Sequence, residues 1–127
     1  DANPCIGVML DHKQFQVYLM FQHYKSDQRT GTAAEYNQLL PQLPAWADGI
    51  DPAHWYLWDK DEMEFADHLS LAEYLDDQEK RQTFNNTALQ TSFLLGKFAF
   101  RRQDTVDDLE EYILTAINDL LPLYEQL

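Results

Sequence analysis

Apolar residues occupy alternate positions along two neighbouring stretches near the start of the chain, within Cys5–Tyr24. The residues that alternate in this way are Ile6, Val8 and Leu10 in the first stretch and Phe15, Val17, Leu19 and Phe21 in the second. A period of two is typical of a β-strand with one buried face. The pattern therefore predicts a β-hairpin in which the second stretch folds back along the first.

The intervening positions of this hairpin are also largely apolar. They include Cys5, Met9, Tyr18 and Met20. A sheet with one solvated face carries polar residues at such positions, so we expect both faces to be covered. Helices can cover one face. For the other we hypothesise either a second copy in a two-fold homodimer or an N-terminal segment that lies outside this sequence.

The middle of the chain predicts short helices interrupted by proline, followed by a strand. Thr and Glu at the ends of 32–35 form a capping box, which predicts a helix directly after it. Pro41 should break or kink this helix, and Pro44 can open a second short helix that ends at Gly49. The aromatic stretch 54–58, HWYLW, predicts the third strand.

The second half of the chain predicts a helix, a strand and a final helix. A capping box at 70–73 predicts a helix that ends near Gln82, before a break at 85–86. The stretch 92–102, SFLLGKFAFRR, predicts a long strand with Gly96 at a β-bulge. The final helix has the clearest amphipathic pattern in the chain.

This final helix is predicted over 106–124, with Pro122 distorting only its last turn. The residues expected to pack on the sheet are Leu109, Ile113, Ile117 and Leu120. The element order is then β-β-α-β-α-β-α. It predicts a single α+β domain over 1–127, with a mainly antiparallel sheet of about four strands and helices packed on it.

Composition adds the charge and the expected compartment. The chain has 127 residues, a single cysteine and a net charge of −13. A lone cysteine and the lack of a visible signal peptide favour the cytoplasm, and the start at Asp1 suggests that a longer protein has been trimmed. The negative charge argues against nucleic acid and against anionic membranes as partners. It fits either solvated helix faces or an acidic surface for a basic partner.

No sequence motif indicates catalysis, a metal or a cofactor. Only four glycines occur, and neither GxGxxG nor a Walker loop can be written. The acidic loop that begins at Asp59 has Glu64 where a calcium loop needs glycine and Ser70 where it needs the bidentate glutamate. The four histidines lack HExxH spacing. We therefore expect no cofactor, no metal and no catalytic residue.

Two groups of residues are candidates for ligand binding. His23 and Tyr24 follow the hairpin, and His54 and Trp58 could gather beside them if the third strand pairs nearby. For each histidine the structural interpretation, a surface or packing role, competes with the functional one.

The second group is basic. Lys97 and Arg101 would share one face of the strand at 92–102 and could hold an anionic ligand. The alternative is that these cations balance neighbouring acids.

Several longer stretches resemble a bacterial family of uncharacterised proteins. They are FQVYLMFQHYKS, LPAWADGID, HWYLWDKDE, SFLLGKFAF and ILTAINDLLPLYEQL. Relatives often carry the label "glucose-6-phosphate 1-dehydrogenase family", and YktB-like domains of unknown function are more distantly similar. The resemblance spans about Cys5 to Leu127 and implies an α+β domain, a further N-terminal segment and no established activity. The chain gives the dehydrogenase label no support, because it lacks a dinucleotide fingerprint.

The sequence is compatible with three functions. The first is a non-enzymatic cytoplasmic domain that binds a protein or a small ligand, as the apolar sheet faces indicate. The second is an acidic inhibitor, DNA mimic or immunity-type protein, as the net charge indicates. The third is an enzyme of unknown reaction that uses a pocket of histidines and aromatic residues.

Overall fold

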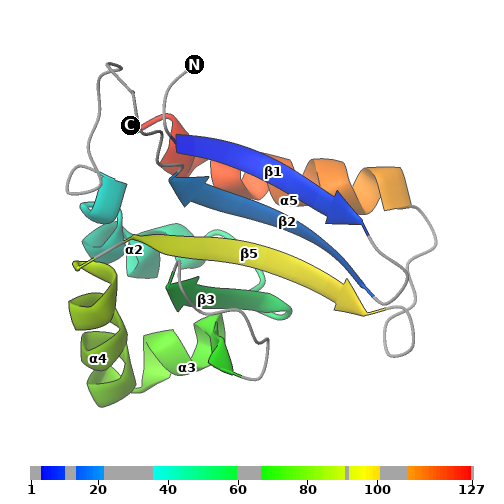
Figure 1. The fold of residues 1–127 in the computed structure, drawn as a ribbon. Helices are drawn as coiled ribbons and strands as arrows, with labels where there is room; N and C mark the ends of the chain where they lie inside the picture. Colours follow the sequence, from blue (N-terminus) through cyan, green and yellow to red (C-terminus); the bar gives the residue numbers. More distant parts are fainter. Residues whose placement is uncertain are drawn as a thin grey trace.

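An antiparallel sheet with helices packed against it forms the protein (Figure 1). The computed structural model describes residues 4–10, 14–21, 36–59, 67–90, 92–100 and 109–126. The strands are β1 (Pro4–Leu10), β2 (Gln14–Phe21), β3 (Trp55–Asp59), β4 (Leu69–Ser70) and β5 (Phe93–Phe100). The helices are the 3-10 helix η1 (Leu40–Gln42), α2 (Leu43–Ala47), α3 (Leu71–Asp76), α4 (Gln78–Ala88) and α5 (Leu109–Tyr124). The α+β prediction is confirmed.

The five strands are ordered β1-β2-β5-β3-β4, and every neighbouring pair is antiparallel. The predicted hairpin is β1 and β2, paired with Gly7 opposite Tyr18. Strand β5 is inserted between β2 and β3, so that Gly96 lies opposite both Tyr18 and Tyr56. The sheet therefore has β1 at one edge and the two-residue β4 at the other.

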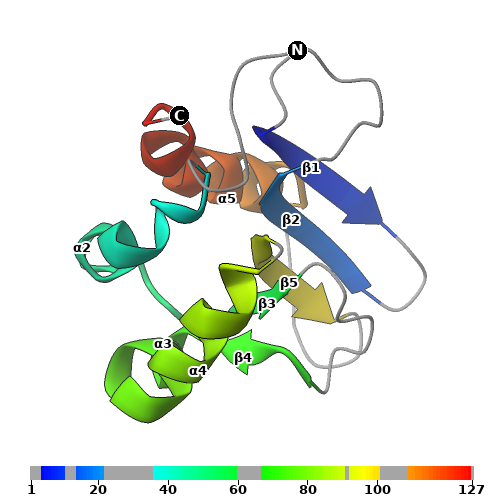
Figure 2. The ribbon, with the colours of Figure 1, turned by 60° about the vertical axis from the view of Figure 1, so that its left-hand side comes forward.

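All the described helices lie on one face of the sheet (Figure 2). Helix α5 covers β1 and β2, while α3 and α4 pack on β3. Between helices and sheet lies one apolar core, whose strand residues include Val17, Leu19, Leu57, Phe93 and Leu95. Their side chains alternate with those of the opposite face, as a period of two requires.

Buried tyrosine hydroxyls connect the helical segments to the sheet and to each other. The Tyr36 hydroxyl donates to the main-chain oxygen of Phe93 at 2.9 Å. In the helical layer, the Tyr74 hydroxyl donates to Asn85 Oδ1 at 3.0 Å. Burial raises the pKa of Tyr36 well above its usual value, so its hydroxyl stays protonated and can donate.

The position of α5 corrects the predicted buried residues of the last helix. Its fully buried residues are Ala116, Leu120 and Leu123. Ile113 and Ile117 are only half-buried, and Leu109 is exposed. The reason is that α5 lies near the β1 edge, where no further element among the described residues covers its outer flank.

The helix predicted from the second capping box is divided in two. Ser70 caps α3 as expected, because its hydroxyl accepts from the Glu73 N–H. The chain then leaves helical geometry at Asp77, whose carboxylate caps α4 through the Lys80 N–H. The break predicted at 85–86 is wrong, since both asparagines lie inside α4. A second capping residue decided where the helix broke.

The structure confirms the predicted interruption at Pro41 but not the predicted bulge at Gly96. Pro41 lies in η1, between residues 36–39 and α2, so the predicted interruption is confirmed. Gly96 is not at a bulge, because the register of β5 is continuous on both sides. Strand β4 was not predicted. The capping box at 32–35 and the strand residues beyond Phe100 lie outside the described residues.

Candidate functional site

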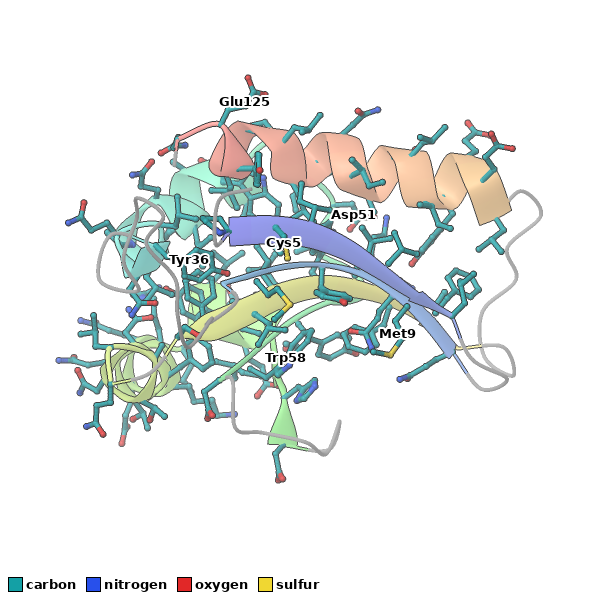
Figure 3. All side chains as sticks on the ribbon, turned by 45° about the horizontal axis from the view of Figure 1, so that its top comes forward. Cys5, Met9, Tyr36, Asp51, Trp58 and Glu125 are labelled. Atoms are coloured by element: carbon teal, nitrogen blue, oxygen red, sulfur yellow. The ribbon has the colours of Figure 1, made fainter. Side chains whose placement is uncertain are left out.

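The helix-free side of the sheet is the most distinctive surface of the molecule. We define this open face by the residues of β1, β2, β3 and β5 whose side chains share it: Cys5, Gly7, Met9, Gln14, Gln16, Tyr18, Met20, Tyr56, Trp58, Leu94, Gly96 and Phe98. Figure 3 shows Cys5, Met9 and Trp58 on the side of the sheet away from α5. None of the twelve residues is Asp, Glu, Lys or Arg.

Two glycines let aromatic rings lie close against the strands of the open face. A Cβ added at Gly96 would come within 2.9 Å of Trp58 Cη2 and 3.1 Å of Tyr18 Cβ. A Cβ added at Gly7 would come within 2.6 Å of Tyr18 Cζ. Each ring therefore occupies space that the Cβ of any other residue would fill.

Around Trp58 the rings form a continuous group, which we call the aromatic layer: Tyr56, Trp58, His68 and Phe98. The imidazole of His68 is stacked on Trp58 with a centroid distance of 4.3 Å and an interplanar angle of 2°. Phe98 meets Tyr56 edge-on at 5.6 Å and Trp58 at 5.5 Å. Phe98 and Trp58 are buried, and no helix among the described residues lies above them.

His68 is held in its neutral form within the aromatic layer. Burial lowers its pKa to about 4, while the neighbouring carboxylates Asp67 and Asp59 act in the opposite direction. Burial therefore outweighs the two acids, because removing the imidazolium from water costs more than their attraction returns. At neutral pH the aromatic layer carries no charge.

The other half of the open face is rich in sulfur. Cys5 and Met20 are half-buried, and the Met9 side chain is 47% exposed. Gln16 donates a hydrogen bond from Nε2 to Met9 Sδ at 3.5 Å. Burial raises the pKa of the Cys5 thiol, so this residue is a small apolar group rather than a thiolate nucleophile.

Lys97 lies on the opposite, helix-covered face of the sheet, since it is paired with Val17 and Trp55. Its Nζ is 4.7 Å from the ring centroid of Tyr112 in α5. It also acts on Asp119, where its charge lowers a pKa that burial raises by a larger amount. Lys97 thus has a packing role between sheet and helix, and binding of an anion by Lys97 stays a prediction.

The structure separates the predicted ligand-binding residues that it describes. Trp58 belongs to the open face and Lys97 to the covered face. His54 is exposed and precedes β3 with a φ of 70°, and its carbonyl accepts from the Phe98 N–H at 2.9 Å. The remaining candidates, His23, Tyr24 and Arg101, lie outside the described residues.

The order of the strands explains this separation. Clustering of His54 with the residues after the hairpin required the third strand to pair with β2, but β5 lies between them. The C-terminal end of β2 lies at the end of the sheet where β3 finishes, whereas His54 lies where β3 begins. The sequence did not single out His68 or Phe98, although Leu94, Gly96 and Phe98 alternate visibly in the sequence of β5.

A second feature is a shallow groove of about 480 Å³ between α4 and the β3–β4 edge. Its lining includes Asp59, Asp77, Glu79 and Lys80. Lys80 forms an ion pair with Glu73 of α3. Among the described residues, no three His, Cys, Asp or Glu side chains gather closely enough to hold a metal ion.

Comparison with known proteins places the chain in a family. A protein-family model matches residues 1–127, so the chain belongs to that uncharacterised protein family. Neither the curated proteins nor the solved structures give a match. In the part of the chain that the structure describes, no helix combines the length and apolar character needed to cross a membrane.

Proposed function

We propose that this protein is a non-enzymatic binding domain whose open face takes up an uncharged, apolar surface of a protein partner. One observation carries this proposal. In a chain with 24% charged residues and a net charge of −13, the twelve residues of the open face include none that is charged at neutral pH. Depletion of charge together with aromatic residues and methionine is typical of the centre of protein interfaces.

The side chains available on this face suit such a partner. Tyr18 and Tyr56 are half-buried rings that present both apolar area and a hydroxyl group. Met9 and Met20 are flexible and polarisable, so they can adapt to a partner's shape. The Trp58 ring lies directly against Gly96, which limits its movement and preorganises this part of the surface.

The composition of the open face favours a protein over nucleic acid. Aromatic residues on a sheet can stack with nucleic-acid bases, but such sites also carry cations along the backbone. The open face offers neither a lysine nor an arginine for that purpose.

The acidic surface supports a second candidate, an inhibitor-type protein that binds a basic partner. Exposed acids occur along the helical layer, including Glu73, Asp76, Glu79, Glu110 and Glu111. They lie on the opposite side of the sheet from the open face. A basic partner would therefore dock on the helices, and its binding would weaken steeply as salt screens the charges.

We further propose that the protein acts in the cytoplasm of a bacterium. A bacterial cytoplasm and a distant similarity to YktB-like domains are compatible with a small binding domain of this family. Glucose-6-phosphate oxidation is not part of the proposal, because the sequence has no glycine-rich dinucleotide motif.

Affinity capture with three versions of the whole chain tests the proposal. The wild type, Met20→Lys on the open face and Leu89→Lys at an exposed apolar site on the helical layer would capture partners at about 50 mM and about 500 mM salt. The captured protein would then be purified for affinity measurements. We expect Met20→Lys to weaken binding by about tenfold or more, with little salt dependence, while Leu89→Lys behaves as the wild type.

Equal affinity of the wild type and Met20→Lys would contradict a role for the open face. A partner that Met20→Lys retains, and that high salt releases, would instead establish the inhibitor-type alternative. The Leu89→Lys control separates the effect of the surface from that of one added positive charge, which by itself reduces the net charge of the acidic chain.

A further inference from the structure

The two edges of the sheet differ in a way that points to self-association. At the β4 edge the terminal strand has two residues. At the β1 edge it has seven, none of them charged, and Val8, Met9 and Leu10 are 43%, 47% and 55% exposed. Edge strands are usually protected by charge, proline or shortness, and within Pro4–Leu10 only Pro4, at the start of β1, offers such protection.

We propose that β1 pairs antiparallel with β1 of a second copy, which joins the two sheets into one. The middle residue of β1 is Gly7. With Gly7 opposite Gly7 of the second copy, Val8 faces Ile6 and Met9 faces Cys5 across the junction. The exposed residues 8–10 of β1 in one copy thereby lie beside residues 4–6 of β1 in the other copy, which are less exposed. Such an interface is self-complementary, as a two-fold dimer requires.

Helix α5 offers a matching surface beside this strand. Tyr112 and Asp119 define the flank of α5 that faces β5, because the Tyr112 hydroxyl donates to the Phe98 main-chain oxygen and Asp119 interacts with Lys97. The opposite flank, towards the β1 edge, carries Leu114, Ile117 and Leu121 at helical spacing. Leu114 is 52% exposed and the other two are half-buried.

The geometry of the sheet brings these flanks together in the dimer. Helix α5 runs alongside β1 and covers both β1 and β2 (Figure 3). Neighbouring strands are about 4.8 Å apart, so helices centred between β1 and β2 in the two copies would be about 10 Å apart. This is the usual distance between packed helices, and the two-fold axis places both helices on the same face of the joined sheet.

The surface that would form the dimer contact carries little charge. Strand β1 has no charged residue, and the acids nearest to the α5 flank are Glu110 in its first turn and Glu125 just after its end. Each copy nevertheless has a net charge of −13, so the copies repel at long range. Added salt should therefore strengthen the dimer, the opposite of its effect on a basic partner.

The dimer is independent of the function proposed for the open face. Pairing at β1 uses an edge of the sheet and a helix flank, and it leaves the half-buried side chains of Tyr18, Met20 and Tyr56 as exposed as they are in one copy. Because the two-fold axis is perpendicular to the sheet, the open faces of both copies would point to the same side. If the protein is a monomer, each molecule still has one open face that can bind a partner. The two proposals can therefore be tested separately.

Self-association is measured by sedimentation on the whole chain from about 5 to about 200 µM, at about 50 mM and about 500 mM salt. The monomer mass is 14.9 kDa. We expect a dimer whose dissociation constant falls at high salt. Val8→Lys should raise that constant by about tenfold or more, because it places cations near each other at the junction, whereas Leu89→Lys should not. Circular dichroism verifies that both variants fold.

Disulfide trapping tests the register itself and does not depend on the lysine variants. In the proposed pairing Cys5 lies opposite Met9 of the second copy, with Cβ atoms about 5 Å apart, which is close to the range for a disulfide. Met9→Cys should give covalent dimers linked between positions 5 and 9, identified by mass spectrometry. Within one strand these positions are about 13 Å apart and cannot join.

Leu89→Cys provides the matched control, since its new thiol is exposed but distant from β1. A wild type that remains monomeric over the whole concentration range would overturn the proposal. So would equal cross-linking of Met9→Cys and Leu89→Cys, or linkage through positions other than 5 and 9.

Discussion

The two faces of the sheet are built by the same strands and stabilised by different means. On the covered face Val17, Leu19 and Leu95 are fully buried beneath helices. On the open face Trp58 and Phe98 are buried almost as completely, and among the described residues their contacts include each other and the ring of His68 rather than a helix. In the part of the chain that the structure describes, the covered face is therefore packed by helices and the open face by contacts between aromatic rings.

This difference changes what each face demands of the sequence. The covered face requires side chains that fill the volume between strands and helices, and close packing makes every methylene count. The open face requires space next to the backbone, which Gly96 and Gly7 provide. The first face is therefore sensitive to loss of volume and the second to gain of volume.

Truncation of an apolar side chain should give the largest difference in unfolding free energy between the two faces. Leu95→Ala should destabilise the fold by about 2–5 kcal/mol, because it leaves a cavity beneath the helices. Met9→Ala, at a largely exposed position on the other face, should cost less than about 1 kcal/mol. Chemical denaturation of both variants measures the difference. Similar losses at the two positions would show that the open face is packed as tightly as the core.

Addition of a single methyl group tests the open face. Gly96→Ala should cost about 1–3 kcal/mol, because the new Cβ would meet Trp58, Tyr18 and the Val17 main-chain oxygen. Gly7→Ala should cost less, since the atoms that it meets are at the far end of the Tyr18 side chain, which can rotate away. Thermal unfolding ranks the two variants. A larger loss of stability in Gly7→Ala than in Gly96→Ala would show that Trp58 does not need the space beside Gly96.

Much of the fold follows from local patterns in the sequence. Alternation from Ile6 to Phe21 defined the hairpin, and the Ser70 capping box defined the start of α3. The division of α3 from α4 did not follow, because it depends on Asp77 acting as a second cap within a helical pattern. The burial of α5 also differed, since the pattern locates an apolar stripe and the sheet edge decides how much of it is covered.

The candidate surface was only partly predictable. Cys5, Met9, Tyr18 and Met20 were recognised as one face, because alternation within a hairpin is local information. The contribution of Trp58, His68 and Phe98 depends on β5 lying between β2 and β3, which is a long-range arrangement. Lys97 and Trp58 illustrate the same point, since only the register reveals that they lie on opposite faces.

Tyrosine hydroxyls offer a smaller test of the comparison. Tyr36→Phe should cost about 1 kcal/mol, because its buried hydroxyl donates to the Phe93 main-chain oxygen on the covered face. Tyr18→Phe should be close to neutral, since no hydrogen bond joins the Tyr18 hydroxyl to the described part of the chain. Urea denaturation resolves a difference of this size. A loss in Tyr18→Phe as large as that in Tyr36→Phe would indicate a polar contact on the open face.

Acidification tests whether the aromatic layer depends on a neutral His68. Its pKa is about 4 in the folded protein, below the value of about 6.5 in an unfolded chain. Between these values the unfolded chain binds more protons, so stability falls as the pH is lowered from about 6.5 to about 4. Because His68 is only half-buried, the slope should stay well below the limit of about 1.4 kcal/mol per pH unit.

His68→Gln isolates this contribution from the titration of nearby carboxyl groups such as Asp59 and Asp67. Unfolding free energies of the wild type and the variant are compared at about pH 7 and about pH 4.5. The advantage of the wild type should shrink at the lower pH, because protonation makes the stacked imidazole costly to bury. A difference that stays constant with pH would mean that a protonated His68 is still solvated in the folded protein. Burial would then not hold the imidazole neutral.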